Sequence, residues 1–268
     1  MEGKRKYTFG GIALAIAKSA AFVGFWITVC SAVATLVAAL LSTYHSGSSV
    51  EAIQGLYDQK SPEISVISNA ITIILFALFY KIRKIPFEER CKIKPRRVST
   101  YLYALGLGAS SQLCILLALS LLMQIIPADW FDKLNETNSS IVNAPIPIML
   151  AATVITAPLL EEIMCRALML GAMKKAMPKW VAIVLSSFIF GLLHANPIGI
   201  IYATLFGILL GWLFVKTDSV LPSILCHLSF NLSSFIIGEK GVGATLLIMS
   251  IPLTVIFIKN IAKTRETE

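Results

Sequence analysis

The chain has 268 residues, of which 56% are hydrophobic and 14% are charged, whereas an average soluble domain has roughly 25% charged residues. Together with a mean hydropathy of +0.78, this composition excludes a soluble globular enzyme, a disordered chain and a disulfide scaffold. It predicts an all-α polytopic membrane protein, with about eight transmembrane helices around an intramembrane polar cavity. The five cysteines include no CxxC pair, so we expect free thiols.

The apolar runs locate the expected spans. They are too long for membrane β-strands and lack alternation, and backbone groups in lipid must be paired within a helix. The predicted spans are residues 19–41, 64–80, 101–126, 146–172, 180–193, 198–215, 221–237 and 242–258. We divide the chain into N-terminal spans (1–145), a candidate catalytic core (146–240) and a last span with its tail (241–268).

The basic residues predict the orientation of the chain. Of its 23 Lys and Arg residues, nineteen fall in the terminal segments and alternate loops of one side, three on the other side, and one, Arg166, in a span. The positive-inside rule therefore predicts a multi-pass protein of the cell membrane with both termini in the cytoplasm. The net charge of +8 reflects this bias, so we expect no nucleic-acid partner. The basic loop 81–97 also suits anionic lipids.

The spans of the second half contain polar side chains that are costly in a membrane and mark function by default. They come from three spans and comprise Glu161, Glu162, Arg166, His194, His227 and Asn231.

Their spacing groups them on helix faces. Glu162 and Arg166 are four residues apart and can pair, while Glu161 points about 100° away and lacks a local partner. The same spacing separates Phe190 from His194, and His227 from Asn231. Counting residues along the spans places His194 nearer the outer face of the membrane than Glu161. The structural alternatives are a buried ion pair and interhelical hydrogen bonds of about 0.6 kcal/mol each.

The fifth span has only 14 apolar residues before His194-Ala195-Asn196-Pro197 interrupts it. Such a break at membrane depth is tolerated where it lines a watery cavity, which predicts a wet pocket at His194. Gly207 and Gly211 form a GxxxG pattern, which we interpret as close helix packing.

These side chains can carry out acyl transfer. A carboxylate and an imidazole can hold and deprotonate one water molecule, and His and Asn on another helix can donate to a developing oxyanion. There is no HExxH or GxSxG motif. Alternatively, His194, His227 and Glu161 provide a zinc ligand set, so zinc stays open as a cofactor.

Three motifs in this order, namely EExxxR from Glu161, FxxxH from Phe190 and HxxxN from His227, resemble the CPBP (Abi) family of type II CAAX prenyl proteases and bacteriocin-processing membrane proteins. The resemblance covers roughly residues 145–240. It implies that Glu161 activates water with His194, that His227 and Asn231 form the oxyanion hole, and that Glu162, Arg166 and Phe190 support the site.

The resemblance implies two substrate classes, prenylated CAAX C-termini and small peptide precursors of bacteriocin or pheromone type. It also allows an immunity role, or a membrane sensor or transporter as partner. Two other functions stay open, a non-catalytic membrane scaffold and a proton-coupled transporter whose Glu and His relay protons. Against the transporter, the sequence shows no inverted repeat.

Overall fold

A computed structural model describes residues 7–123, 125–238 and 243–264, and every regular element in these ranges is helical. The elements in chain order are α1 (Phe9–Tyr44), α2 (Val50–Gln59), α3 (Ser61–Ile82), α4 (Phe87–Cys91), α5 (Val98–Leu122), α6 (Ala128–Val142), α7 (Ile146–Met149), η1 (Leu150–Thr156), α8 (Ala157–Glu162), η2 (Ile163–Leu170), α9 (Gly171–Ala176), α10 (Lys179–Leu192), α11 (Pro197–Thr217), α12 (Val220–Gly238) and α13 (Ala244–Lys263). The elements η1 and η2 are π-helical.

The chain is an all-α, multi-pass membrane protein. Among the described residues, seven helices are long and apolar enough to cross a membrane, counting α7 to α9 as one continuous span. The predicted fifth span is α10, which has only 14 residues and is too short for hydrocarbon about 30 Å thick. Of the eight expected spans, seven are helices long enough to cross a membrane, and one, α10, is a shorter helix. Val242, where the last predicted span begins, lies outside the described residues.

Besides the short α4 in the basic loop 81–97, two further segments expected to be loops contain helices. The first, α2, begins after Ser49, whose side chain accepts a hydrogen bond from the backbone N–H of Ala52 at 3.3 Å, as an N-cap residue does. The second is α6, which shows no buried residue where its burial is described. Apolar runs could not reveal them, because both helices are largely polar.

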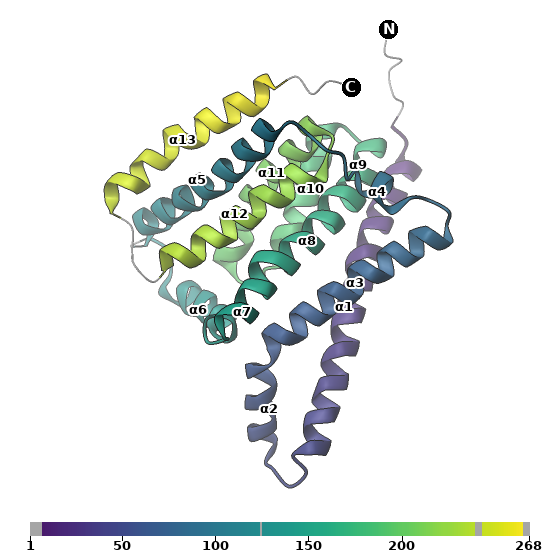
Figure 1. Cartoon of the computed structure of the whole chain (residues 1–268), viewed down its shortest axis with the longest axis vertical. Coiled ribbons are helices and arrows are strands. Elements are labelled where there is room, and N and C mark those ends of the chain that lie inside the picture. Colours follow the sequence, from purple (N-terminus) through teal and green to yellow (C-terminus); the bar gives the residue numbers. More distant parts are fainter. Residues whose placement is uncertain (1–6, 124, 239–242, 265–268) are drawn as a thin grey trace.

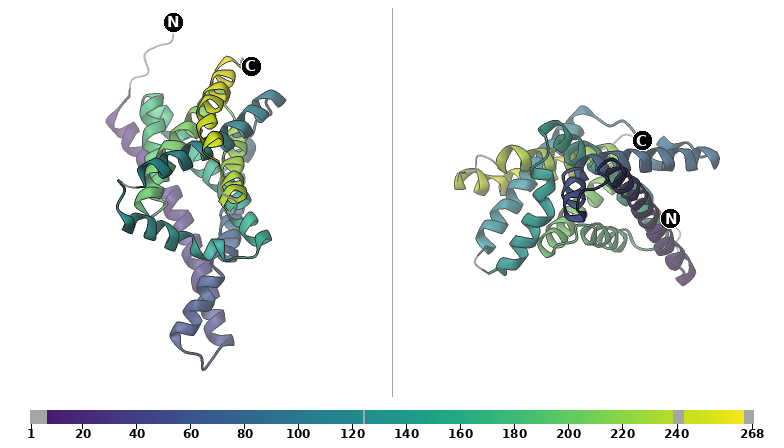
Figure 2. Two further views of the ribbon diagram at one scale, coloured as in Figure 1. Left: turned by 90° about the vertical axis from the view of Figure 1, so that its left-hand side faces the viewer. Right: turned by 90° about the horizontal axis from the view of Figure 1, so that it is seen from below.

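The helices form a compact bundle from which one corner projects. In Figure 1, α5, α12 and α13 lie side by side, and α2 projects with the adjoining ends of α1 and α3. The left view of Figure 2 shows the same projection of α2 with the adjoining ends of α1 and α3. The span α7 to α9 lies between helices α1 and α3 on one side and α12 on the other. It contacts α1, α3, α10 and α12. The candidate site residues of this span therefore lie inside the bundle.

Small residues allow the central helices to approach closely. A Cβ atom on Gly108 of α5 would lie 2.0 Å from the carbonyl oxygen of Cys226 on α12. Gly207 and Gly211 of α11 face α10 in the same way, where added Cβ atoms would lie 3.0 Å from side-chain atoms of Ser187 and Ile183. The packing interpretation of the GxxxG pattern is thus confirmed.

Polar contacts join the loop before α5 to the turn between α11 and α12. Lys92 and Lys94 both form ion pairs with Asp218, and the distance from Nζ of Lys94 to Oδ2 of Asp218 is 3.0 Å. Ser219 donates from Oγ to the carbonyl of Lys94 at 2.6 Å, and the N–H of Val220 donates to the carbonyl of Lys92 at 3.1 Å. These contacts hold the start of α12, the helix of His227 and Asn231.

We expect Gly108→Ala to lower the thermal unfolding midpoint of the detergent-solubilised protein, because the methyl group forces α5 and α12 apart. Overpacking of this kind costs about 1–3 kcal/mol. Gly24→Ala on α1 is the matched control, because nothing lies within 4 Å of its added Cβ. Equal midpoints for the two variants would contradict this account of the α5–α12 contact.

Candidate active site

The two glutamates lie where an α-helical turn meets a π-helical one. Glu161 and Glu162 end α8, and Arg166 lies in η2. Segments of π-helix are rare in proteins, and those that occur often lie at functional sites. Here the widened turns lie on both sides of the Glu-Glu pair, within a span that is half buried in the bundle.

Glu162 and Arg166 form the predicted pair. Nε of Arg166 donates to Oε2 of Glu162 at 3.2 Å, and both side chains are completely buried. The guanidinium carbon also lies 4.9 Å from the centroid of the Phe190 ring, a cation–π distance. Nη1 and Nη2 of Arg166 have no hydrogen-bond partner among the described residues. The arginine therefore offers two further donors in the protein interior.

His227 joins both glutamates from the neighbouring helix α12. Its Nδ1 lies 3.1 Å from Oε1 of Glu162, and its Nε2 lies 3.7 Å from Oε2 of Glu161. The rings of Phe190 and Phe206 flank the imidazole at 5.9 and 5.5 Å. Glu161, whose side chain is 22% exposed, thus has a partner that helix spacing did not reveal.

The break after α10 positions His194. Asn196 caps α11, because its Oδ1 accepts from the N–H of Gly199 at 2.7 Å and its Nδ2 donates to the carbonyl of His194 at 3.0 Å. Pro197 begins the helix, as proline favours, and Ala195 turns the chain with a φ of 58°. The predicted interruption is confirmed.

The His194 ring is oriented by its own helix and by aromatic neighbours. Nδ1 lies 3.1 Å from the carbonyl oxygen of Phe190, and a carbonyl can only accept, so Nδ1 carries the proton of that bond. In the neutral ring Nε2 is then free to accept. The rings of Phe190 and Tyr202 lie 5.0 and 5.9 Å away.

Asn231 is held by a carbonyl that the π-helix leaves unpaired. The Nδ2 of Asn231 donates to the carbonyl of Thr153 at 2.7 Å. In a π-helix that carbonyl would accept from residue 158, but Pro158 has no N–H. The N–H of Ala157 is bonded to the carbonyl of Ala152 instead. The oxygen of Thr153 is therefore available to the side chain from α12.

The structure links both glutamates to His227 and both imidazoles to the ring of Phe190. The Phe190 ring lies 5.0 Å from the imidazole of His194 and 5.9 Å from that of His227. The imidazole that approaches Glu161, at 3.7 Å, is that of His227. The sequence analysis did not single out Tyr202, Phe206 or Thr153 as neighbours of these residues. A proline five residues after Thr153 was the only sequence signal for the latter contact.

The predicted zinc ligands do not fit a metal ion as they lie. Among the side chains that the structure describes, no three of the types His, Cys, Asp and Glu group around a common metal position. We therefore derive no step through a metal.

Comparison with known proteins finds a family match for the part of the chain that contains the candidate site. Residues 143–233 match the family of type II CAAX prenyl endopeptidase Rce1-like proteins. The resemblance seen in the sequence is confirmed for this segment. The Rce1-like segment contains every residue of the predicted site.

One curated relative is the "Putative membrane peptidase YdiL" of Bacillus subtilis (strain 168), which is 31% identical to this chain over 86 residues. That alignment covers 32% of this chain and 35% of the relative, so the chain spans about a third of the length of the relative it matches. No solved structure matches the chain significantly. The family match and the alignment with this relative each cover about a third of the chain.

The Thr153–Asn231 contact can be tested by a double-mutant cycle. We expect Asn231→Ala to lower stability by about 1–3 kcal/mol, because it removes the partner of a part-buried carbonyl. In a Pro158→Ala background the restored N–H of residue 158 can reach that carbonyl, so the same substitution should cost less. Unfolding of the four proteins in detergent measures the coupling. Costs that are equal in the two backgrounds would contradict our explanation.

We expect Arg166→Ala to reduce the yield of folded protein severely. It leaves Glu162 as a buried charge without its guanidinium partner, a loss worth about 3–5 kcal/mol. The double variant Glu162→Gln/Arg166→Met removes both charges and should recover part of the yield. Size-exclusion profiles of the solubilised proteins measure this, and an Arg166→Ala profile like that of wild type would refute the role of the pair.

Proposed function

We propose that the chain is an intramembrane endopeptidase in which Glu161 activates water to hydrolyse a peptide bond. One observation carries the proposal: two adjacent glutamates of one span meet a histidine from another inside a membrane protein. The match of residues 143–233 to type II CAAX prenyl endopeptidase Rce1-like proteins supports the same reaction class.

The two glutamates have different environments, which suits different roles. Glu162 is completely buried and contacts both Arg166 and His227, so its charge is balanced within the protein. Glu161 is the more accessible carboxylate. We therefore assign Glu161 the catalytic role and Glu162 the role of orienting His227 through Nδ1.

A single water molecule can contact both groups of the proposed catalytic pair. Hydrogen bonds to water are about 2.8 Å long, so one oxygen atom can lie within that distance of both Oε2 of Glu161 and Nε2 of His227, which are 3.7 Å apart. This favours His227 as the imidazole that orients the water. The free Nε2 of His194 can accept a hydrogen bond, and we assign it to an N–H of the substrate.

In the proposed reaction, Glu161 takes one proton from the water, and the resulting hydroxide attacks the carbonyl carbon of the peptide bond. The carbonyl oxygen becomes an oxyanion. The amide of Asn231 has a second N–H beside the one bonded to Thr153, and we assign it to this oxyanion. The proton on Glu161 then passes to the leaving nitrogen as the C–N bond breaks.

The substrate classes are those that the family implies, a prenylated CAAX C-terminus or a small peptide precursor. The relative from Bacillus subtilis carries the name "Putative membrane peptidase YdiL", which is compatible with either class. The scaffold alternative makes no use of an accessible carboxylate beside an imidazole, and the sequence shows no inverted repeat of the kind found in many transporters, so we place both alternatives after hydrolysis.

We expect Glu161→Gln to lower cleavage by a factor of about 10²–10⁴, because the amide keeps the shape but cannot accept the proton. The unfolding midpoint should stay near that of wild type. Glu88→Gln, an exposed change in α4, is the control for loss of a carboxylate. Purified protein would be tested on matched prenylated and unmodified peptides. Wild-type cleavage by Glu161→Gln would exclude the catalytic role of Glu161.

The same assay addresses zinc and the choice of substrate. We expect a chelator to leave cleavage largely intact, because the three predicted ligands do not surround one position. Loss of activity that zinc restores would contradict this expectation. Cleavage of unmodified leader peptides alone would favour peptide maturation over CAAX processing, and cleavage of neither class would favour a scaffold.

We further propose that the termini and residues 81–97 face the cytoplasm of the cell membrane. Cys91 is a poor labelling probe, because it is fully buried and burial raises the pKa of its thiol to about 12. Exposed positions such as Glu89 in α4 and Gln59 in α2 are suitable sites for introduced cysteines.

In a background with Cys30 and Cys114 replaced by serine, we expect a membrane-impermeant maleimide to label Gln59→Cys in intact cells. Glu89→Cys should react only after the cells are opened, because the positive-inside rule places this basic loop within. Each variant serves as the control for the other. Labelling of Glu89→Cys in intact cells would overturn the orientation.

A further inference from the structure

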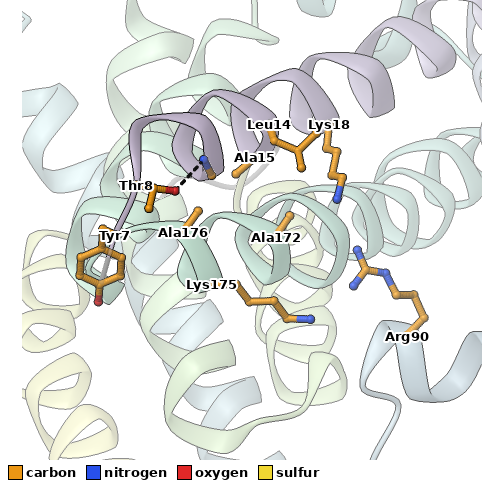
Figure 3. Close-up of a pocket in the computed structure, with 10 residues that line it drawn as sticks. Tyr7, Thr8, Leu14, Ala15, Lys18, Arg90, Ala172, Lys175 and Ala176 are labelled. Carbon is orange, nitrogen blue, oxygen red and sulfur yellow. Dashed lines mark hydrogen bonds between the residues drawn. The ribbon is translucent and has the colours of Figure 1, made fainter. Parts of the chain in front are cut away.

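A basic pocket lies away from the candidate active site, between the beginning of α1, the short helix α4 and α9. It has a volume of about 290 Å³. Three cationic side chains line it, Lys18 from α1, Arg90 from α4 and Lys175 from α9. Figure 3 shows all three extending toward the same space. Three elements distant in sequence thus contribute like charges to one pocket.

The pocket has open space because small residues line it on both α1 and α9. Gly11 and Ala15 of α1, and Ala172 and Ala176 of α9, line it and are spaced four residues apart on their helices, so each pair shares a helix face. Larger side chains at these positions would fill the space between the helices.

Within residues 7–123, 125–238 and 243–264, the three cations have no anionic partner. Among the described residues, no carboxylate forms an ion pair with Lys18, Arg90 or Lys175. Like charges gathered in this way repel each other, and an anion in the pocket would relieve the repulsion. Nothing in the proposed catalytic reaction uses them.

Arg90 is held in place for such an anion. Its Nε donates to the hydroxyl of Tyr80 at 3.1 Å, and its guanidinium carbon lies 5.5 Å from the centroid of that ring. The two terminal nitrogens remain available, and a guanidinium presents them in a fork that matches phosphate oxygens. Lys18 and Lys175 are exposed and can close on the same anion.

We propose that this pocket binds a phosphate group, that of an anionic phospholipid headgroup. The beginning of α1, α4 and the end of α9 belong to the basic side of the protein, which we place in the cytoplasm. The cytoplasmic leaflet carries anionic lipids, and basic pockets between transmembrane helices bind their headgroups. A soluble phosphate compound offers the same chemistry, and the experiment separates the two sources.

The test uses the full-length protein in neutral detergent and native mass spectrometry, with phosphatidylglycerol and phosphatidylcholine as probes. We expect wild type to retain phosphatidylglycerol preferentially. Lys18→Gln/Lys175→Gln should weaken this retention by about fivefold for each lysine removed. Lys81→Gln/Lys84→Gln is the control, because it removes the same charge from exposed positions outside the pocket.

Inorganic phosphate, compared with chloride at equal ionic strength, identifies the source. Phosphatidylglycerol that stays bound in phosphate supports the lipid headgroup. Displacement by phosphate in wild type supports a phosphate site filled from solution, which overturns the lipid assignment. Two results would overturn the pocket as the binding site. One is equal phosphatidylglycerol retention by wild type and both double variants, and the other is an equal loss of retention in the two double variants. Arg90→Lys, which keeps the charge without the fork, should retain less lipid than wild type at an unchanged unfolding midpoint.

Discussion

A buried network of charges inside a membrane protein is the constraint on which the rest of this structure depends. Glu162 and Arg166 are completely buried, and His227 joins them from α12. Removing a single partner would leave a charge without compensation in a medium of low dielectric constant. The network therefore fixes the rotation of α12 relative to α8, because the imidazole can satisfy Glu162 and approach Glu161 only in a narrow range of orientations.

The backbone of the central span has adapted to this arrangement. Pro158 follows the π-helical segment that precedes Glu161 and has no N–H to donate, which leaves the carbonyl of Thr153 to the amide of Asn231. A second contact from α12 is thus attached to the same span that provides the glutamates. Close approach of α5 at Gly108 supports α12 from its other side. One helix is held by packing, by a charge network and by a backbone acceptor, so its two polar side chains have defined positions.

The basic residues have two separate physical roles in our interpretation. Their distribution between the two sides sets the orientation, which depends only on their number in each loop. The gathering of Lys18, Arg90 and Lys175 in one pocket is a property of the folded chain, since these residues come from three different elements. An orientation signal alone does not require that cations converge, and this difference is the reason to test the pocket with a control of equal charge.

The sequence by itself determined the fold class, the positions of the spans, the Glu162–Arg166 pair and the break at His194. Each of these depends on local chemistry: apolar length, four-residue spacing, or the capping and proline residues at 196 and 197. Only the tertiary structure decided that His227 is the imidazole facing Glu161, that Asn231 bonds Thr153, and that three cations share a pocket. Residue spacing defines directions within one helix, but the depth and rotation of one helix against another follow from packing of the whole bundle.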